Sequence, residues 1–211
     1  MGMLLCLFGV DGSGKTTFAR YVAKYLHIRG FYVVIAWMRG THTIASVLAR
    51  ILACSSVFRG PCNPYYKICI PPKMKRLWLW IEFISILPVI LLRFAVPKLL
   101  GRVVVAERSL IDFLAWLIVT LRWSRIIGGF IGRSIVSLQL SLCDGVIYVR
   151  ADLDTLLARR RGYPEEHLIP IQLRIYDAIA KALQAPCIDT SRKTVSESIR
   201  EILKIIGVGY G

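Results

Sequence analysis

The stretch GVDGSGKTT, residues 9–17, decides how the N-terminal part of this chain folds. It contains the pattern GxxxxGK[ST], in which glycines frame a short loop and a lysine and a threonine follow. The continuous apolar run Met3–Phe8 precedes it, and apolar residues at helical spacing follow it up to residue 28. The pattern therefore predicts a strand buried on both faces, a glycine-rich turn and a helix in direct succession.

A loop of this composition binds the phosphate groups of a nucleotide. Glycine allows backbone conformations in which several N–H groups point at one anion, and the N-terminus of the next helix adds partial positive charge. Lys15 is expected to reach the β- and γ-phosphates, and the Thr16 hydroxyl is expected to ligate Mg²⁺. The candidate ATP-binding residues are Gly9, Asp11, Gly12, Ser13, Gly14, Lys15, Thr16 and Thr17.

The rest of the chain alternates strand-like apolar runs with helical patterns of crossover length. Further strands are expected at 31–36, 103–105, 146–149 and 186–188, helices at 44–54 and 194–206, and a loop at 60–72. Such alternation predicts a parallel sheet with helices on both faces. We therefore expect residues 1–211 to form one domain with a three-layer α/β/α P-loop NTPase fold and about five strands.

The chain is strongly basic. Its 28 Lys and Arg outnumber the 13 Asp and Glu, which gives a formal net charge of +15. Nucleotide phosphates, nucleic acid and an anionic membrane surface are the partners that such a charge favours. The basic residues are scattered and form no tail or long run, so we expect small-molecule nucleotides, and no nucleic acid, as partners.

None of the six cysteines forms a CxxC pair, so a metal site built from cysteines is not expected. Cys6 and Cys187 lie in apolar runs and are expected to be buried thiols in strands. A bridge among Cys54, Cys62 and Cys69 requires a cell that tolerates intracellular disulfides. The first apolar run leads directly into the glycine-rich loop instead of a cleavage site, which predicts a cytoplasmic protein.

Residues 77–92 form a stretch that is apolar at nearly every position. Glu82 within it, Pro88 and the following Arg93 argue against a helix that spans a membrane. A helix that is apolar all round has to be covered. A buried helix or a homodimer face is therefore favoured, and contact with a membrane surface remains the alternative.

The loop with its acidic Asp11 resembles the branch of nucleotide kinases that includes thymidylate kinase. In that family the acidic residue hydrogen-bonds the 3′-hydroxyl of the acceptor nucleotide or a nearby water; an Asx turn is the structural alternative. Arg39, after the second predicted strand, resembles the family's arginine that binds the acceptor phosphate, although the usual Glu-Pro after it is missing. Arg50 resembles a second arginine of the same segment.

Glu107-Arg108-Ser109, after the third predicted strand of the sheet, resembles the family's Asp-Arg-Tyr or Asp-Arg-His signature, with Glu in place of Asp. The resemblance implies that Glu107 takes part in holding Mg²⁺ and its water, and that Arg108 reaches the acceptor phosphate. The carboxyl ends of parallel strands are where ligands bind in such sheets. A structural ion pair at the sheet edge is the alternative.

Arg159-Arg160-Arg161, at the end of a helix predicted to begin near Asp152, resembles the lid of these kinases. Some thymidylate kinases have an arginine at the position of Gly12, and those that lack it supply a catalytic arginine from the lid. The resemblance therefore implies a lid at about 159–168 with catalytic arginines, while a solvated basic helix end is the alternative. Residues 189–191 resemble the loop beside the donor adenine, or form a helix N-cap.

Together these features imply a phosphotransferase that moves the γ-phosphoryl group of ATP, with Mg²⁺, to a nucleoside monophosphate. The leading acceptor is dTMP, although the family's base-reading arginine and aromatic residue are missing from residues 77–92. Arg76, Arg93 and Trp80 are possible substitutes. One alternative is a P-loop kinase for another nucleotide or a nucleoside. Another is a non-catalytic nucleotide-binding protein docked to a membrane or partner through residues 77–92.

Overall fold

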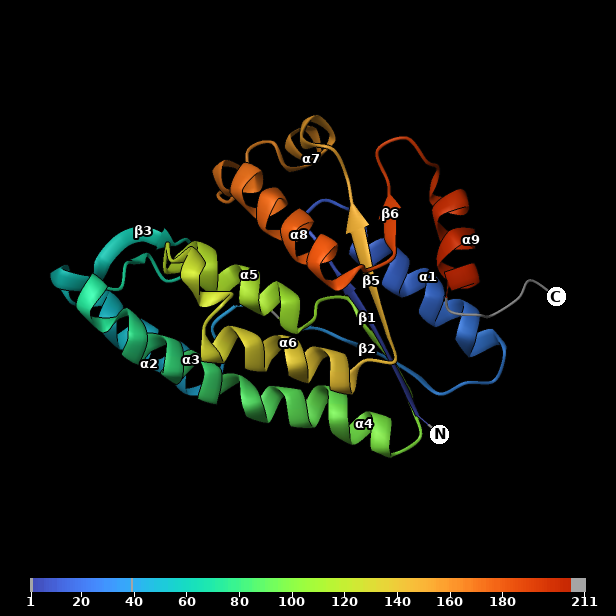
Figure 1. Cartoon of the computed structure of the whole chain (residues 1–211), viewed down its shortest axis with the longest axis horizontal. Coiled ribbons are helices and arrows are strands. Elements are labelled where there is room, and N and C mark those ends of the chain that lie inside the picture. The colour runs from blue at the N-terminus through green and yellow to red at the C-terminus, as the bar shows by residue number, and fades with distance from the viewer. Residues whose placement is uncertain (1, 39, 206–211) are drawn as a thin grey trace.

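Five parallel strands form the central sheet (Figure 1). The computed structural model describes residues 2–38 and 40–205. All neighbouring pairs of strands run parallel, which confirms the predicted sheet, and the strand ends differ from the prediction by a residue or two. In spatial order the strands are β2 (Val33–Ala36), β4 (Val103–Ala106), β1 (Met3–Phe8), β5 (Gly145–Arg150) and β6 (Cys187–Asp189).

Strand β1 lies in the middle of the sheet, where Cys6 pairs with Ala106 of β4 on one side and with Val146 of β5 on the other. Its residues 4–8 are almost wholly buried, as expected for an apolar strand covered on both faces. Because the strands are parallel, the carboxyl ends of β1 and β4 meet at one edge of the sheet. The glycine-rich loop and the residues after β4 are thereby brought together.

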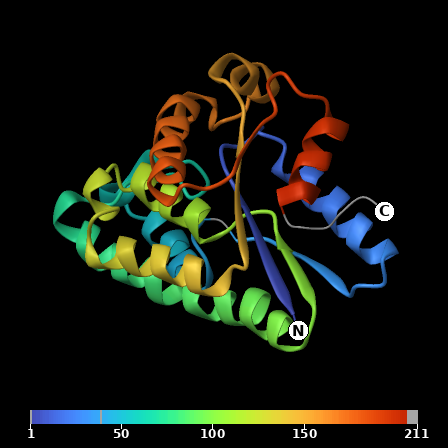
Figure 2. The same ribbon diagram turned by 45° about the vertical axis from the view of Figure 1, so that its right-hand side comes forward.

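Helices cover both faces of this sheet (Figures 1 and 2), so the predicted three-layer architecture is confirmed. On one face lie α1 (Lys15–Ile28) and α9 (Val195–Ile205). On the other lie α2 (Thr43–Ala53), α3 (Lys75–Ile90), α5 (Leu110–Thr120), α6 (Phe130–Leu142) and α8 (Ile169–Leu183). Helix α4 (Val96–Leu99) precedes β4, and α7 (Leu153–Arg160) follows β5.

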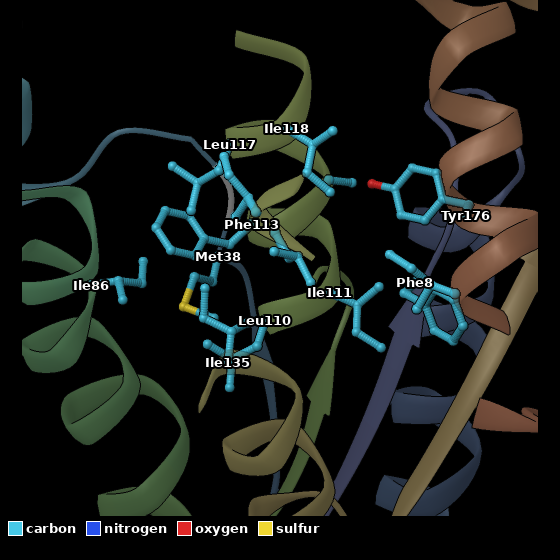
Figure 3. Close-up of a cluster of buried hydrophobic side chains, with 14 of the residues drawn as sticks. Phe8, Met38, Ile86, Leu110, Ile111, Phe113, Leu117, Ile118, Ile135 and Tyr176 are labelled. Carbon is cyan, nitrogen blue, oxygen red and sulfur yellow. The ribbon is translucent and has the colours of Figure 1, made fainter. Parts of the chain in front are cut away.

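The larger hydrophobic core lies on the face with more helices. Figure 3 shows Ile86 of α3, Phe113 of α5 and Ile135 of α6 directed toward the side chain of Met38, which follows β2. Tyr176 of α8 closes the same core above the sheet. This packing holds α5 against the end of β1, where the glycine-rich loop begins.

Two disulfides are present, and the Cys62–Cys69 bridge is one of those that the sequence left open. Cys6 of β1 is bridged to Cys143 at the end of α6, so it is buried as predicted but is not a thiol. Cys62 is bridged to Cys69, and Cys187 is exposed although a buried position was predicted. Sequence spacing could not show the first pair because its members are 137 residues apart and meet only in the fold.

The predicted loop at 60–72 also differs from the observed structure. It contains the short strand β3 (Arg59–Asn63), which forms antiparallel bridges with Ile68 and lies outside the main sheet. The Cys62–Cys69 disulfide closes this small hairpin. Glycine and proline in the segment indicated a turn, but only the cross-strand partners define the strand.

The apolar stretch at 77–92 forms most of α3, which continues as a π-helical turn, Leu91–Ala95, after Pro88. Proline lacks the N–H that would bond to the carbonyl of Ile84, so Pro88 removes one hydrogen bond within α3 without ending the helix. One side of α3 packs on the core through Ile86 and Ile90, and the opposite side is exposed. The prediction of a buried helix is therefore correct for one side only.

Candidate nucleotide-binding site

The loop between β1 and α1 has the backbone that the glycine pattern predicts. Gly9, Gly12 and Gly14 all have positive φ, a conformation that other residues rarely adopt. A Cβ atom on Gly9 would lie 2.2 Å from the carbonyl oxygen of Val149 in β5. The loop is thus folded against the neighbouring strand, with its N–H groups at the N-terminus of α1.

The side chain of Lys15 is buried and folds back over this loop. Its Nζ donates hydrogen bonds to the carbonyl oxygens of Gly9 (2.6 Å) and Val10 (2.9 Å), and lies 3.8 Å from Oδ1 of Asp11. These contacts hold the ammonium group at the loop, where the motif places it against phosphate oxygens.

Thr16 and Glu107 meet at the edge of the sheet although 91 residues separate them. The hydroxyl of Thr16 donates a hydrogen bond of 2.6 Å to Oε1 of Glu107, which follows β4. An adjacent hydroxyl and carboxylate form the kind of oxygen donor set that Mg²⁺ prefers. The residues present therefore fit the magnesium ion that the motif implies. Among residues 2–38 and 40–205 no group of three or more His, Cys, Asp and Glu is suited to a metal.

Arg108 forms an ion pair with Asp11, with Nη2 and Oδ1 2.6 Å apart. Because Asp11 also faces Lys15, one carboxylate of the loop links the donor-side lysine to an arginine that follows the neighbouring strand β4. The structure thus brings together the loop and the arginine that the resemblance assigned to the acceptor phosphate.

Asp112 is a buried residue of this site that sequence analysis missed. Its carboxylate accepts hydrogen bonds from the N–H of Ser109 (2.9 Å), the hydroxyl of Tyr176 (3.0 Å) and the N–H of Gly9 (3.4 Å). Burial raises the pKa of Asp112, and the charge of Lys15 opposes this shift most strongly. The Ser-x-x-Asp spacing is a capping-box signal for the start of α5, but its contact with Gly9 depends on the fold.

Helix α7 begins at its N-cap Asp152, as predicted, and its arginines make different contacts from one another. The guanidinium of Arg159 donates to the carbonyl of Gly12 (3.0 Å) and to both oxygens of Thr190 (3.1 Å each). Arg159 therefore joins α7 to the glycine-rich loop and to the loop after β6.

Arg160 and Arg161 have different environments. Arg160 lies over the glycine-rich loop, since a Cβ atom at Gly12 would be 2.9 Å from its Cγ. Its guanidinium lies 3.7 Å from a carboxylate oxygen of Glu165 and 3.9 Å from the centre of the Tyr163 ring. Arg161 is exposed and does not line the cleft. Only the first two arginines of the run are therefore in place to meet a ligand.

These groups enclose a cleft of about 430 Å³, here named the donor cleft. Sequence analysis missed the contributions of Phe18 in α1, of Lys193, and of Val195 and Ser198 in α9. The donor cleft is lined by Asp11, Gly12, Gly14, Lys15, Thr16, Thr17, Phe18, Arg108, Arg159, Arg160, Thr190, Lys193, Val195 and Ser198. Gly9 and Ser13 belong to the glycine-rich loop but do not line the donor cleft.

A second, narrow hollow of about 10 Å³ adjoins the donor cleft. The two share Asp11 and Arg108, so the ion pair of these residues stands between them. The remaining lining comes from α5 and α8 and consists of Asp112, Ala115, Trp116, Gln172 and Tyr176. We name it the side pocket.

Three further predictions concern Arg39, Arg50 and Asp189. Arg39 is outside the residues that the structure describes. Arg50 is exposed in the last turn of α2 and lines neither the donor cleft nor the side pocket. Position in a segment does not determine which side of a helix faces the site. Asp189 does not cap α9, because Thr194 and Glu197 form reciprocal hydrogen bonds there.

A buried strand, a glycine-rich loop, a helix and a Lys-Thr pair define the class of P-loop folds. Within that class, the fold is that of thymidylate kinases. The thymidylate kinase from Candida albicans aligns with a TM-score of 0.62 at 14% identity, over 98% of this chain and 91% of that chain. The thymidylate kinase from Ehrlichia chaffeensis aligns with a TM-score of 0.58 at 16% identity, over 97% and 98%.

A deoxyadenosine kinase from M. mycoides with bound dCTP gives a TM-score of 0.48 at 17% identity, over 97% of this chain and 99% of that chain. Models of known protein families and curated protein sequences give no match. The likeness to thymidylate kinases is therefore one of fold, and the activity has to be inferred from the site.

Proposed function

We propose that this chain is a nucleoside monophosphate kinase that transfers the γ-phosphoryl group of ATP, with dTMP as the leading acceptor. The observation that supports it is the ion pair of Asp11 with Arg108, which stands between the donor cleft and the side pocket. A group transfer between two anions needs a phosphate-binding loop and a second cationic site beside it. Both occur here at one edge of the sheet.

On the donor side, the loop N–H groups and Lys15 bind the triphosphate. Thr16 and Glu107 would hold Mg²⁺, which when bound neutralises charge on the β- and γ-phosphate oxygens. Lys15 and the N-terminus of α1 are held in place before any ligand arrives, by bonds to Gly9 and Val10. Such preorganised charge requires little rearrangement in the transition state.

On the acceptor side, Arg108 binds the phosphate of the monophosphate and Asp11 orients the group beside it. The side pocket lies where the rest of the acceptor would enter, and it is narrow in this structure. Entry of a base therefore requires Trp116, Gln172 or Tyr176 to move. The choice of dTMP rests on the resemblance to thymidylate kinases, because no feature of the side pocket selects thymine.

The lid supplies the remaining positive charge. Arg159 is a positioning residue because its guanidinium is engaged by Gly12 and Thr190. We assign the catalytic role to Arg160, which lies over the loop and has one carboxylate partner at 3.7 Å. A guanidinium that closes on the transferred phosphoryl group stabilises its equatorial oxygens.

Turnover with a panel of acceptors tests this proposal. The chain is incubated with ATP, Mg²⁺ and each of the nucleoside monophosphates and nucleosides, and ADP formation is followed by a coupled assay. Turnover that depends on a monophosphate supports the proposal, and preference for dTMP supports its narrower form. Turnover with nucleosides only, or binding of ATP with no acceptor-dependent turnover, would contradict it. The cytoplasmic location and the homodimer expected from the sequence remain predictions.

A further inference from the structure

The small hairpin of residues 59–69 packs against helix α5, which carries Trp116 of the side pocket (Figure 1). The ring of Tyr65, at the tip of this hairpin, lies 5.4 Å from the ring of Trp116, and the two ring planes are 39° apart. Trp116 is only 3% exposed, whereas Tyr65 is 59% exposed. An exposed ring from the hairpin and a buried ring from α5 thus meet at the side pocket.

The backbone of the hairpin is held in place by its own contacts. Oδ1 of the buried Asn63 accepts a hydrogen bond of 3.1 Å from the N–H of Tyr65. The Cys62–Cys69 disulfide joins the two sides of the hairpin, and Ile68, which is 1% exposed, anchors it in the larger core. The fold therefore presents the ring of Tyr65 to Trp116 before any ligand arrives, and little backbone ordering has to accompany binding.

Trp116 connects this aromatic pair to the proposed site of the acceptor phosphate. The side pocket that it lines begins at the ion pair of Asp11 and Arg108. The indole of Trp116 also packs against Gly40, where a Cβ atom would lie 3.9 Å from its Cε2 and Nε1. Movement of Trp116 toward Gly40 is thereby limited, whereas the side chain of Tyr65 can move without leaving the core. The side pocket can therefore widen toward the hairpin.

Two aromatic rings in this position match the chemistry of a nucleotide base. Every base has π-faces, and stacking on aromatic side chains stabilises any of them. Carbon atoms in contact lie about 3.5 Å apart, so a base between Tyr65 and Trp116 requires about 7 Å between the two rings. The present distance of 5.4 Å has to increase by less than about 2 Å. Rotation of the exposed Tyr65 side chain is sufficient for such a change.

We propose that Tyr65 and Trp116 enclose the base of the acceptor nucleotide, so that the hairpin is part of the acceptor site. The proposal rests on the proposed function, because it takes Arg108 as the contact to the acceptor phosphate. Stacking discriminates little among bases. The aromatic pair therefore raises the affinity for a nucleoside monophosphate over a sugar phosphate without a base, and does not by itself select thymine.

Equilibrium dialysis of the full chain with dTMP, dCMP, dAMP and dGMP finds the monophosphate that binds most tightly, and variants are then compared with it. Tyr65→Ala is matched by Tyr21→Ala on α1, because the two tyrosines are 59% and 51% exposed and Tyr21 lines neither the donor cleft nor the side pocket. We expect Tyr65→Ala to raise Kd by about tenfold, since one stacking contact is lost. Tyr65→Phe, which keeps the ring, and Tyr21→Ala should stay within about twofold. The Kd for 2-deoxyribose 5-phosphate, which has no base, should not change.

An unchanged Kd in Tyr65→Ala would overturn the proposal. So would equal increases in Tyr65→Ala and Tyr21→Ala, or an equal increase for 2-deoxyribose 5-phosphate, which would show that Tyr65 only supports the fold. Thermal unfolding of each variant checks that it is folded. If Tyr65→Ala does not fold, Tyr65→Leu is compared with Tyr21→Leu, and equal affinities would again overturn the proposal.

Failure of the proposed function gives a different result. Base binding that Tyr65→Ala weakens, without acceptor-dependent turnover in the wild type, supports the aromatic site and contradicts only the kinase activity. Turnover with a monophosphate whose Kd does not change in Tyr65→Ala contradicts only the aromatic site. Wild-type protein that binds none of the four monophosphates would overturn both.

Discussion

The donor cleft and the exposed side of α3, here named the helical face, use positive charge in opposite ways. At the donor cleft, cations are paired within the protein: Arg108 with Asp11, and Arg160 with Glu165. On the helical face, the described residues form no salt bridge to Lys73, Lys75 or Arg76. Internal pairing fixes the position of a charge, which suits the transfer of a small group. Charge without an internal partner is available to an external surface.

Lys15→Ala should have the largest effect of these changes, and the effect should be on the donor cleft. We expect kcat/KM for phosphoryl transfer to fall by at least about 10³-fold, because the ammonium group that binds the β- and γ-phosphates is lost. A coupled assay measures the loss. Retained turnover would contradict the donor assignment.

Arg160→Ala should lower kcat by about 10³-fold, the contribution typical of an arginine that stabilises a transferring phosphoryl group. Arg161→Ala is the matched control, because Arg161 is exposed and does not line the donor cleft. Steady-state kinetics at saturating ATP and acceptor compare the two. Equal losses, or a larger loss in Arg161→Ala, would show that the role of Arg160 is wrongly assigned.

Glu82→Gln tests how the helical face is held to the fold. Burial raises the pKa of Glu82 from 4.5 to about 7, while hydrogen bonds from Thr41 and Trp78 oppose the shift. Between these values the folded chain binds more protons than the unfolded chain, so this group makes stability fall as pH rises from about 4.5 to about 7. Above pH 7 the ionised Glu82 lowers the free energy of unfolding by its full cost of burial, roughly 3 kcal/mol for such a shift.

The neutral glutamine keeps an oxygen that accepts the bonds from Thr41 and Trp78. We therefore expect Glu82→Gln to be more stable than the wild type by roughly 3 kcal/mol above neutral pH, and nearly equal to it near pH 4.5. Urea unfolding at a series of pH values measures the difference. A stability difference that does not vary with pH would show that folding does not raise the pKa of Glu82.

Arg108→Ala should have the smallest effect of these changes. We expect KM for the acceptor to rise by about tenfold, because one charge-assisted contact to its phosphate is lost, with a smaller change in KM for ATP. Initial rates with each substrate varied in turn measure both constants. An unchanged acceptor KM would count against the role given to Arg108.

Much of the fold was predictable because its signals are local. Glycines at the spacing of residues 9–14 specify a turn wherever they occur, and the apolar run Met3–Phe8 specifies a buried strand. Residues that follow β1 and β4 were expected at one site because parallel strands bring their carboxyl ends to one edge of the sheet. Thr16 and Glu107 do meet there.

The partners of buried and surface groups were decided by the tertiary structure. The Cys6–Cys143 bridge and the bond from Gly9 to Asp112 join residues more than a hundred positions apart, which no local pattern reports. Neighbouring arginines differ in role because a helical turn directs Arg159 and Arg160 to the donor cleft and Arg161 to solvent. Likewise, the sequence determined that residues 77–92 are an apolar helix. Only packing decided which side remains exposed. The hydrophobic effect favours removing an apolar surface from water, but it is non-directional and does not select the surface that covers it.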